Sequence, residues 1–414
     1  MGKAMKIYQV GGAVRDRVLG VYAQDVDHVV IGATSQEMID LGYRSVGKNF
    51  PVFLHPKTHE EYALARKEIK TGDKHTDFKF VFDKSITLQE DVLRRDFTVN
   101  ALVYDEESNE IIDLVDGISD IKNKVIRHIN SEHFIEDPLR VLRMCRFCAQ
   151  LDFEICAETM LLAQNMVAQN MLLHLTKERV FQEIEKALNT PRFDKFILSM
   201  RACGALKIIL PEVDMLFNIP ENEKYHPEKN SGEHTLLALQ RAFSYRPELK
   251  YAVLLHDIGK IQTPSSIWPG HYGHDLRGDA LIREISNRIK APKKYKDMAL
   301  FGCKYHMMIR KVLQMNLSDL YDFVFEISGK FKQKEKMQDL FLLCEADMRG
   351  RAAPLEEKEF LNFENAQNRC LLLYEKMQTI KVQDMPDFAI LSKDKSFRLA
   401  FKKFALEKLS HEFI

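Results

Sequence analysis

Residues 5–32, MKIYQVGGAVRDRVLGVYAQDVDHVVIG, decide how the chain begins to fold. MKIYQV predicts a strand, the two glycines predict a tight turn, AVRDRVLG predicts a short helix, and VDHVVIG predicts a second strand. TSQEMIDLG (34–42) follows as a helix that begins at a Ser or Thr cap. The order of these segments predicts a first domain that mixes strands and helices.

Later segments extend this pattern and then change it. Further strands are predicted in HEEYALAR (59–66) and from RRDFTVNALVYD (94–105) to EIIDL (110–114). After residue 137 the apolar residues repeat at helical spacing, as in PLRVLRMCRFCAQL (138–151), AETMLLAQNMVAQNM (157–171) and TKERVFQEIEKALNT (176–190).

The polar stretch IPENEKYHPEKNSG (219–232) predicts a linker or long loop, and a histidine-rich helical region follows it. We therefore predict an α+β chain of four parts. These are a domain with a mixed sheet (1–137), a helical segment (138–220), a histidine-rich helical domain (221–350) and a helical tail (351–414).

Composition limits the classes of protein. A chain of 414 residues is too long for one ordinary domain, and its 45% apolar and 29% charged residues are typical of globular proteins. The N-terminus lacks the layout of a signal peptide, and the seven cysteines suggest free thiols, so we expect a cytoplasmic protein without membrane segments. The CxxC of Cys145 and Cys148 has no second pair at zinc-binding spacing and predicts core packing.

The formal net charge is zero, so the overall charge predicts no polyanionic partner. Basic residues nevertheless gather in REISNRIKAPKKYKD (283–297) and FRLAFKKFALEK (397–408). These segments could hold a nucleic-acid backbone, but solvated helix faces would look the same.

The first candidate site combines a phosphate turn with two carboxylates. Gly11 and Gly12 let the backbone approach a ligand, and the start of the helix that follows favours an anion such as a nucleotide phosphate. Asp25 and Asp27 have the spacing that places two side chains on one face of a strand. Paired carboxylates beside a phosphate are typical of a Mg²⁺ site.

This order, hydrophobic–Gly–Gly, a spacer and Asp–hydrophobic–Asp, resembles the signature of the DNA polymerase beta-like nucleotidyltransferases. Further motifs narrow the resemblance to bacterial class II tRNA nucleotidyltransferases, the CCA-adding enzymes: Arg15, Asp16, RRDFTVNA (94–101), EDPLR (136–140), PVFLHPKTHEEYALAR (51–66) and TKERVFQEIEKALNT (176–190). The resemblance runs from residue 5 to about residue 350. His28 departs from the signature, and we expect it to pack in the fold.

The resemblance implies a polymerase beta-like head (1–137), a helical neck that binds RNA (138–220), and a reaction in which CTP and ATP extend the 3′ end of tRNA. It implies that Asp25 and Asp27 hold the catalytic metals. It also implies a set of nucleotide-binding residues: Gly11, Gly12, Arg15, Arg95, Asp96, Asn100, Asp137, Arg140 and Arg143.

Asp137 and Arg140 have a chemistry that suits two of the four bases. Asp137 would also cap a helix that Pro138 opens. Cytosine and adenine present an amino donor beside a ring-nitrogen acceptor, which complements a carboxylate and a guanidinium. Guanine and uracil present the opposite order and would leave buried polar groups unpaired. The pair could therefore select C and A without a nucleic-acid template.

The segment KEIKTGDKHTDFKFVFDKSITLQED (67–91) is polar, rich in lysine and too long for a simple turn. Its length predicts a functional or mobile connection that contains Gly72. In the family a flexible loop at this place helps the pocket to change from CTP to ATP, which argues against an enzyme that adds only CC.

The second candidate site surrounds LLHDIGK (254–260). His256 and Asp257 interrupt an apolar helix, and more nitrogen and oxygen donors that suit a divalent transition metal stand elsewhere: His234, His271, His274, His306 and Asp347. The pattern is similar to that of HD-domain phosphohydrolases. It implies that His234, His256, Asp257 and Asp347 hold a metal such as Ni²⁺ or Mn²⁺, with the other three histidines as auxiliary groups. The implied substrates are 2′,3′-cyclic phosphate or 2′-phosphate ends, although an inactive inherited site would have the same pattern.

We therefore predict a tRNA 3′-terminal nucleotidyltransferase, monomeric or homodimeric, that adds or repairs CCA and has a possible phosphohydrolase activity. Three alternatives stay open. They are an A-adding enzyme of the same family, a bacterial poly(A) polymerase, and a regulatory HD phosphohydrolase whose nucleotidyltransferase half only binds nucleotide.

Overall fold

The computed structural model describes residues 5–22, 25–46, 52–70, 78–224, 226–354, 356–385 and 397–410. The chain forms two compact units: Met1–Glu183 with Lys195–Ile208, and Ile184–Asp194 with Ile209–Ile414. The finer division at residues 137, 220 and 350 stays a prediction.

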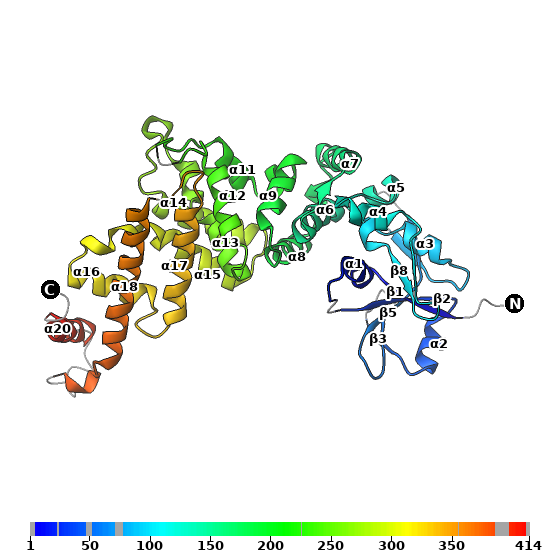
Figure 1. Cartoon of the computed structure of the whole chain (residues 1–414), viewed down its shortest axis with the longest axis horizontal. Helices are drawn as coiled ribbons and strands as arrows, with labels where there is room; N and C mark the ends of the chain where they lie inside the picture. The colour runs from blue at the N-terminus through cyan, green and yellow to red at the C-terminus, as the bar shows by residue number, and fades with distance from the viewer. Residues whose placement is uncertain are drawn as a thin grey trace. The chain divides into compact units, whose positions relative to one another are not determined.

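A mixed sheet organises the first unit, in agreement with the predicted fold class (Figure 1). Within the described residues its strand order is β3 (Arg44–Val46), β4 (Val52–Leu54), β5 (Glu61–Leu64), β2 (Asp27–Ile31), β1 (Lys6–Val10), β8 (Val103–Asp105) and β9 (Glu110–Ile112). Strand β1 runs antiparallel to both β2 and β8, whereas β2 and β5 are parallel.

The opening motif folds as its pattern predicts. Helix α1 (Gly12–Leu19) follows β1 through Gly11, whose φ of 77° favours glycine. Helix α2 (Ser35–Asp40) begins at a capping box, in which the Thr34 hydroxyl accepts the N–H of Glu37 and the Glu37 carboxylate accepts the N–H of Thr34.

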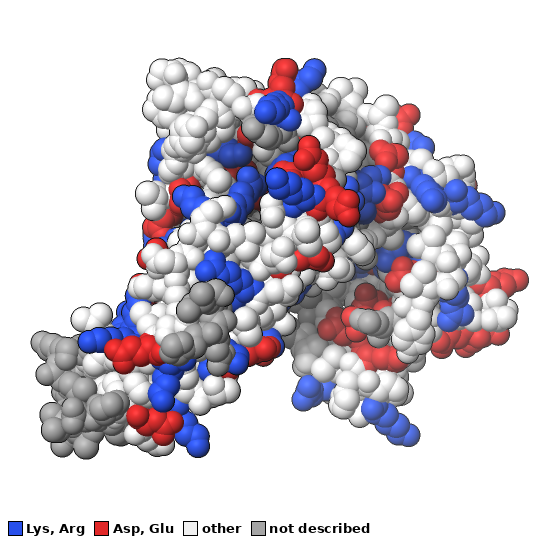
Figure 2. Space-filling view, turned by 60° about the vertical axis from the view of Figure 1, so that its left-hand side comes forward, with Lys and Arg blue, Asp and Glu red and all other residues white. Residues whose placement is uncertain are grey.

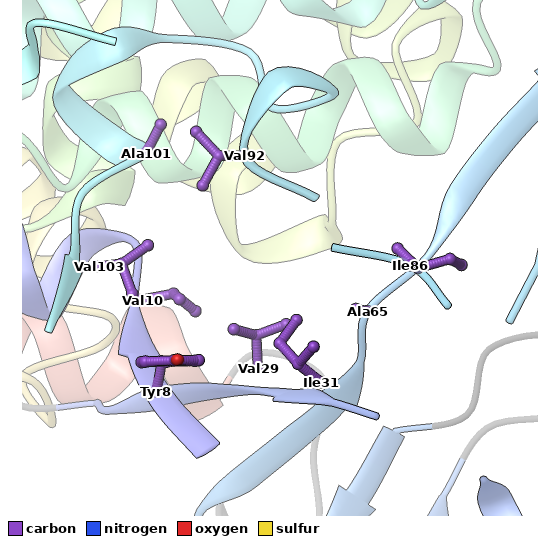
Figure 3. Close-up of a cluster of buried hydrophobic side chains, with 9 residues drawn as sticks. All are labelled: Tyr8, Val10, Val29, Ile31, Ala65, Ile86, Val92, Ala101 and Val103. Carbon is purple, nitrogen blue, oxygen red and sulfur yellow. The ribbon is translucent and has the colours of Figure 1, made fainter. Parts of the chain in front are cut away.

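One face of the sheet carries a hydrophobic core (Figure 3). Alternate residues of β1, β2 and β8 point to this face, as the two-residue period of a strand requires. The buried cluster consists of Tyr8, Val10, Val29, Ile31, Ala65, Ile86, Val92, Ala101 and Val103. This packing fixes the ends of β1 and β2, where the first candidate site lies.

Two predictions in the first unit need correction. The predicted connection of residues 67–91 contains regular structure, because β6 (Lys67–Lys70) and β7 (Phe78–Val81) pair as antiparallel strands and α3 (Leu88–Leu93) follows; its functional role stays a prediction. Gly72 lies outside the described residues.

The predicted strand in RRDFTVNALVYD exists only in its last three residues, β8. The 3₁₀ helix η1 (Thr98–Asn100) and the turns before it replace the rest. Tertiary contacts impose this shape, because the N–H of Thr98 donates to the carbonyl of Arg127 (3.0 Å) and the Thr98 hydroxyl donates to Asp120 (2.7 Å).

The remainder of the first unit is mainly helical. The short strands β10 (Val125–Ile126) and β11 (Glu154–Ile155) pair in parallel. The further helices that lie wholly or partly in this unit are α4 (Gly117–Lys122), α5 (Ser131–Glu136), α6 (Leu139–Leu151), α7 (Ala157–Ala168), η2 (Met171–His174), α8 (Lys177–Leu188), α9 (Phe193–Ala202) and α10 (Ala205–Ile209).

The second unit is helical over its described residues, and α13 packs against α15 while α12 packs against α17 (Figure 1). Its helices are α11 (Pro211–Met215), η3 (Leu216–Asn218), α12 (Ser231–Arg241), α13 (Pro247–Leu255), η4 (Ile258–Gln262), η5 (Ser265–Ile267), α14 (His274–Arg288), α15 (Lys293–Tyr305), η6 (His306–Gln314), α16 (Leu317–Ile327), α17 (Lys334–Arg349), α18 (Glu357–Thr379), η7 (Val382–Asp384) and α20 (Phe397–Leu409).

Gly259 allows η4 to lie directly on α14. A Cβ atom at Gly259 would be 1.9 Å from the carbonyl oxygen of His274 and 2.7 Å from the nitrogen of Gly278. Only glycine permits this approach, which brings LLHDIGK (254–260) close to the first turn of α14.

Three further observations concern the cysteines, membrane segments and surface charge. All seven cysteines are free thiols, and Cys145 and Cys148 are buried in α6, as core packing predicts. Among the described residues, no helix has both the length and the apolar character needed to cross a bilayer. Acidic and basic side chains are intermixed on the face seen in Figure 2, with uncharged surface between them.

Acidic residues compensate part of the charge of both basic segments. Their ion pairs are Arg283–Asp279, Arg288–Glu212, Lys294–Glu248 and Lys402–Asp322. Such pairing is typical of solvated helix faces, which was one of the two interpretations of these segments.

Candidate functional site

The predicted phosphate turn brings Arg15 next to Asn100. The buried Arg15 guanidinium donates to Asn100 Oδ1 (2.6 Å) and to Asp16 Oδ1 (2.9 Å). A Cβ atom at Gly12 would lie 3.5 Å from this guanidinium, and one at Gly11 would lie 3.7 Å from that of Arg95. The structure therefore joins the glycine turn to residues 95–100, which are far away in the sequence.

Asn100 offers a hydrogen-bond donor to a ligand. Its side chain is buried, and its Nδ2 has no hydrogen-bond partner among the described residues. A buried amide group without a partner is costly unless a bound molecule accepts from it.

The two predicted metal carboxylates lie at the start of β2. The strand begins at Asp27, so Asp25 precedes it by two residues and is exposed. Desolvation raises the pKa of Asp27, the charge of Arg95 lowers it, and the charge of Asp25 raises it again. The mutual repulsion of these two carboxylates would be relieved by a divalent cation.

Asp91 organises the two adjacent arginines, a role that the sequence did not indicate. This fully buried carboxylate accepts from Arg94 Nε (2.9 Å) and Arg95 Nη2 (3.0 Å). Burial alone would raise the pKa of Asp91, but the charges of Arg95 and Arg94 hold it below its usual value.

Asp96 and Arg143 bind each other through a charged network. Arg143 Nε donates to Asp96 Oδ2 (2.7 Å), and Glu183 lies between Arg143 (3.9 Å) and Arg146 (2.6 Å). Burial would raise the pKa of Asp96, yet Arg143 lowers it. The network links the RRD segment to α6.

Asp137 and Arg140 are both held in place. Helix α6 begins at Leu139, one residue later than predicted, and Asp137 Oδ1 accepts the N–H of Leu139 (3.1 Å) as a capping side chain does. Asp137 Oδ2 accepts from Arg179 Nη2 (2.7 Å). Arg140 donates to the carbonyls of His133 and Arg94, the latter at 3.0 Å. Arg179 is a further residue that the sequence did not single out.

His28 packs in the fold, as expected. It is buried in β2, and its ring stacks on Tyr62 with centroids 4.1 Å apart and an interplanar angle of 5°.

In the second unit, three predicted histidines make the same type of contact with the backbone. The Nδ1 atoms of His256, His274 and His306 lie 2.7–2.8 Å from the backbone carbonyl three residues earlier. The tautomer that donates from Nδ1 leaves a lone pair on each Nε2, which is the atom that can bind a metal.

These lone pairs meet the predicted carboxylates. His256 Nε2 lies 3.3 Å from Asp257 Oδ2 and 3.7 Å from Asp347 Oδ1, yet it makes no hydrogen bond with the described residues. Burial disfavours the imidazolium, but Asp257 and Asp347 raise the pKa of His256 to about 10. Surroundings that favour a positive charge so strongly also favour a metal cation.

Among the described residues, three groups of side chains could hold a metal; one of them, His226, Glu228 and His234, includes two residues outside the predicted set, and the predicted donors form the other two. One contains His234, His256 and Asp347, and the other contains Asp257, His274 and His306. Asp257 faces both, because its Oδ1 lies 3.1 Å from His274 Nε2 and its Oδ2 lies near His256. The predicted auxiliary residue His271 lies in neither group and contacts the carbonyl of Pro220 (2.9 Å).

Sequence analysis missed four groups around this site. Glu228 Oε1 lies 3.1 Å from His234 Nδ1 and fixes the orientation of that ring. Lys260 Nζ contacts Asp257 Oδ2 (2.7 Å) and Glu221 Oε1 (2.6 Å). Arg310 Nη2 contacts Asp347 Oδ2 (3.2 Å). Glu221 and Glu228 belong to the stretch predicted as a linker, whereas Lys260 ends the HDIGK motif and had a signal.

Comparison with known proteins identifies the family. The sequence model of the poly A polymerase head domain matches residues 7–127, and that of the probable RNA and SrmB-binding site of polymerase A matches residues 152–216. A multifunctional CCA protein of Teredinibacter turnerae is 44% identical over 361 residues, covering 86% of this chain and 87% of the relative. The chain belongs to the family of multifunctional CCA proteins.

Other multifunctional CCA proteins agree. The one from Methylobacillus flagellatus is 45% identical over 350 residues, 84% of each chain, and one from Vibrio vulnificus is 42% identical over 386 residues, 92% of this chain and 93% of the relative. A solved CCA-adding enzyme in an apo form has a TM-score of 0.63 at 20% identity and covers 98% of this chain and 88% of its own. A CCA-adding enzyme solved with CTP has a TM-score of 0.62 at 23% identity and covers 98% and 86%. The predicted family and the α+β fold are confirmed.

Proposed function

We infer that this chain is a tRNA nucleotidyltransferase that adds or repairs the 3′-terminal CCA from CTP and ATP without a nucleic-acid template. The observation that carries this function is the 44% identity with a multifunctional CCA protein over 86% of the chain. In the reaction the 3′ hydroxyl of the tRNA attacks the α-phosphorus of the nucleotide, a P–O bond forms, the hydroxyl proton is lost, and pyrophosphate leaves.

We propose that residues of the first unit divide this work. Asp25 and Asp27 would hold Mg²⁺, which supplies charge neutralisation for the attacking and leaving oxygens. The turn at Gly11 and Gly12, together with the guanidinium groups of Arg15 and Arg95, would bind the triphosphate. Asn100 Nδ2, which is buried and without a partner among the described residues, would donate to the ribose.

Base selection is assigned to Asp137 and Arg140. Each retains hydrogen-bonding capacity after its contacts within the protein, because a carboxylate oxygen has two lone pairs and a guanidinium has five N–H groups. Asp137 can therefore accept from an amino group while Arg140 donates to a ring nitrogen. Asp96 and Arg143 support them through the ion pair that ties α6 to the RRD segment.

The test supplies tRNAs that end before CCA, after C or after CC, with CTP, ATP or both. Completion of all three ends supports the proposal. Extension only of the CC-ending tRNA by ATP would identify an A-adding enzyme, and long adenylate tails would identify a poly(A) polymerase. A protein that extends none of them contradicts the proposal.

We also propose that the second unit hydrolyses phosphoesters with a divalent transition metal such as Ni²⁺ or Mn²⁺. The four inward-facing histidines and two carboxylates fit such ions, and the buried His256 Nε2 lacks any other partner among the described residues. Water forms the new P–O bond, the ester P–O bond breaks, and the alcohol leaves with a proton. Proposed substrates are 2′,3′-cyclic phosphate and 2′-phosphate ends.

Two variants separate the activities. The double variant Asp25→Ala, Asp27→Ala should lose CCA addition and keep hydrolysis of 2′,3′-cyclic AMP, whereas His256→Ala should do the reverse. Calorimetric titration with Ni²⁺ gives a second measurement, since His256→Ala should weaken binding at one position. Hydrolysis that survives His256→Ala would refute the assignment.

Several predictions complete the proposal. The four-part division, a monomer or homodimer, and a cytoplasmic location stay predictions, the last supported by seven free cysteines. The tail from residue 351 is proposed to bind the body of the tRNA.

A further inference from the structure

A smaller cavity adjoins the cavity at the second candidate site. The main cavity has a volume of about 600 Å³, and a smaller one of about 200 Å³ adjoins it. Arg310, Asp347, Arg351 and Glu359 line both, so the two cavities are neighbours. A molecule whose phosphate lies beside Asp347 would extend directly into the smaller cavity.

Two guanidinium groups stand at the junction. Arg310 contacts Asp347 at 3.2 Å, and Arg351 Nη1 donates to Glu359 at 3.2 Å. The Arg351 side chain is only 10% exposed, and its Nε has no hydrogen-bond partner among the described residues. A buried N–H of this kind is satisfied when a bound molecule supplies an oxygen acceptor.

The smaller cavity has both apolar and polar lining residues. We call it the side slot, and its apolar lining consists of Ile309, Leu313, Met348, Phe363 and Ala366. The side chains of Gln314 and Asn362 also line it and are exposed. Each of these amides carries both a donor and an acceptor.

We infer that the side slot binds the base of a nucleotide whose phosphate is hydrolysed at the neighbouring histidine and aspartate groups. This inference rests on the proposed phosphohydrolase function and names the part of the substrate that the slot holds. The lining residues complement the three parts of a nucleotide, which are a phosphate, a sugar with hydroxyl acceptors, and a flat ring with a polar edge. Phe363 would contact the ring, Gln314 and Asn362 would bond its edge, and Arg351 would bond the sugar.

The amides can turn either a donor or an acceptor towards a base. We therefore expect little discrimination among the four bases in the side slot, in contrast to the carboxylate and guanidinium pair of the first unit. Because of this difference, one nucleotide can distinguish binding in the side slot from binding in the first unit. Guanosine 2′-monophosphate fits the side slot but has the wrong polarity for Asp137 and Arg140.

The experiment uses the full chain loaded with Ni²⁺ and compares guanosine 2′-monophosphate with glycerol 2-phosphate, which has no base. We expect a KM at least about 10-fold lower for the nucleotide, the gain from one base stacked on an aromatic ring. Phe363→Leu should raise the nucleotide KM by about the same factor and leave the KM of glycerol 2-phosphate in place. Asn362→Ala, on the exposed edge, gives a variant that does not disturb packing. Leu372→Ala, 43% exposed on the same helix, is the matched control.

Equilibrium dialysis of guanosine 2′-monophosphate with the metal-free protein provides a readout without catalysis. Weaker binding by Phe363→Leu and Asn362→Ala, but not by Leu372→Ala, supports the inference. Equal KM values for the two substrates, or unchanged binding in both slot variants, overturn it. Loss of hydrolysis for both substrates in the wild type would instead overturn the phosphohydrolase, and dialysis would still decide whether the side slot binds a base.

Discussion

Replacement of Lys260 by Met tests whether a buried ion triad holds the second unit together. Lys260 Nζ lies 2.7 Å from Asp257 Oδ2 and 2.6 Å from Glu221 Oε1. The three side chains are at most 8% exposed. The variant therefore leaves two buried carboxylates without their shared cation.

The expected loss of stability follows from burial. An exposed ion pair contributes less than about 1 kcal/mol, whereas removal of one partner from a buried pair costs about 3–5 kcal/mol. Here Asp257 keeps His274 at 3.1 Å, and Glu221 keeps the Ser231 hydroxyl at 2.6 Å. Because these contacts remain, we expect Lys260→Met to lower the free energy of unfolding of the metal-free protein by about 3 kcal/mol, the lower end of that range.

Urea unfolding followed by fluorescence measures this loss. Trp268 is the only tryptophan of the chain, and its indole N–H donates to the carbonyl of Thr263 (3.1 Å), so it reports on the second unit near Lys260. With a slope of about 3 kcal/mol per molar urea, the midpoint should fall by about 1 M. Saturating Ni²⁺ should reduce the difference, because a bound cation neutralises Asp257 in place of the lysine.

Controls decide whether the ion triad is responsible. Lys311→Met removes an exposed lysine that lines the same cavity and should change the free energy of unfolding by less than about 0.5 kcal/mol. Adding Glu221→Gln to Lys260→Met should recover part of the loss, since one unpaired charge disappears. A Lys260→Met effect no larger than that of Lys311→Met, or a double variant no more stable than the single one, would show that the ion triad does not stabilise this unit.

Three other perturbations have defined outcomes. Burial lowers the pKa of Lys250 to about 8, so the folded state binds this proton less tightly than the unfolded state. The free energy of unfolding of the wild type, relative to Lys250→Met, should therefore rise by up to about 3 kcal/mol between pH 8 and 10.5, as urea midpoints at both pH values will show. Gly259→Ala places a Cβ atom 1.9 Å from the carbonyl of His274 and should lower the stability seen by tryptophan fluorescence by about 3 kcal/mol; an unchanged midpoint would contradict this. Arg146→Met leaves Glu183 buried without its arginine at 2.6 Å and should lower the free energy of unfolding of the first unit, measured by hydrogen exchange, by about 3 kcal/mol. The double variant Arg146→Met, Glu183→Leu should recover most of this loss. Equal losses in the two variants would contradict the role of this pair.

Local sequence patterns predicted much of the fold. The strand, glycine turn and helix of residues 6–19 formed as predicted because alternation, a positive φ and a helical repeat are properties of neighbouring residues. The strand predicted for RRDFTVNALVYD was wrong over most of its length, because contacts of Thr98 with Arg127 and Asp120 override the strand preference of these residues. The pairing of β6 with β7 was not predicted, although KEIK and FKFV alternate polar and apolar residues as strands do.

Residue types and spacing pointed to the glycine turn, to Asp25 and Asp27, and to the histidines and aspartates of the second site, whereas the family resemblance supplied the other nucleotide-binding residues. Only the tertiary structure decided how they are held. Arg179 reaches Asp137 from 42 residues away, and no local spacing reveals such a partner. Asp91 and Glu228 lie only four and six residues from Arg95 and His234, but their burial and contacts appear only in the folded chain. The side slot has the same origin, because η6, α17 and α18 meet there through packing. The kinds of chemical group in this protein are therefore readable from its sequence, whereas which groups share a charge, a proton or a ligand follows from the fold, because those energies depend on distance and burial in space.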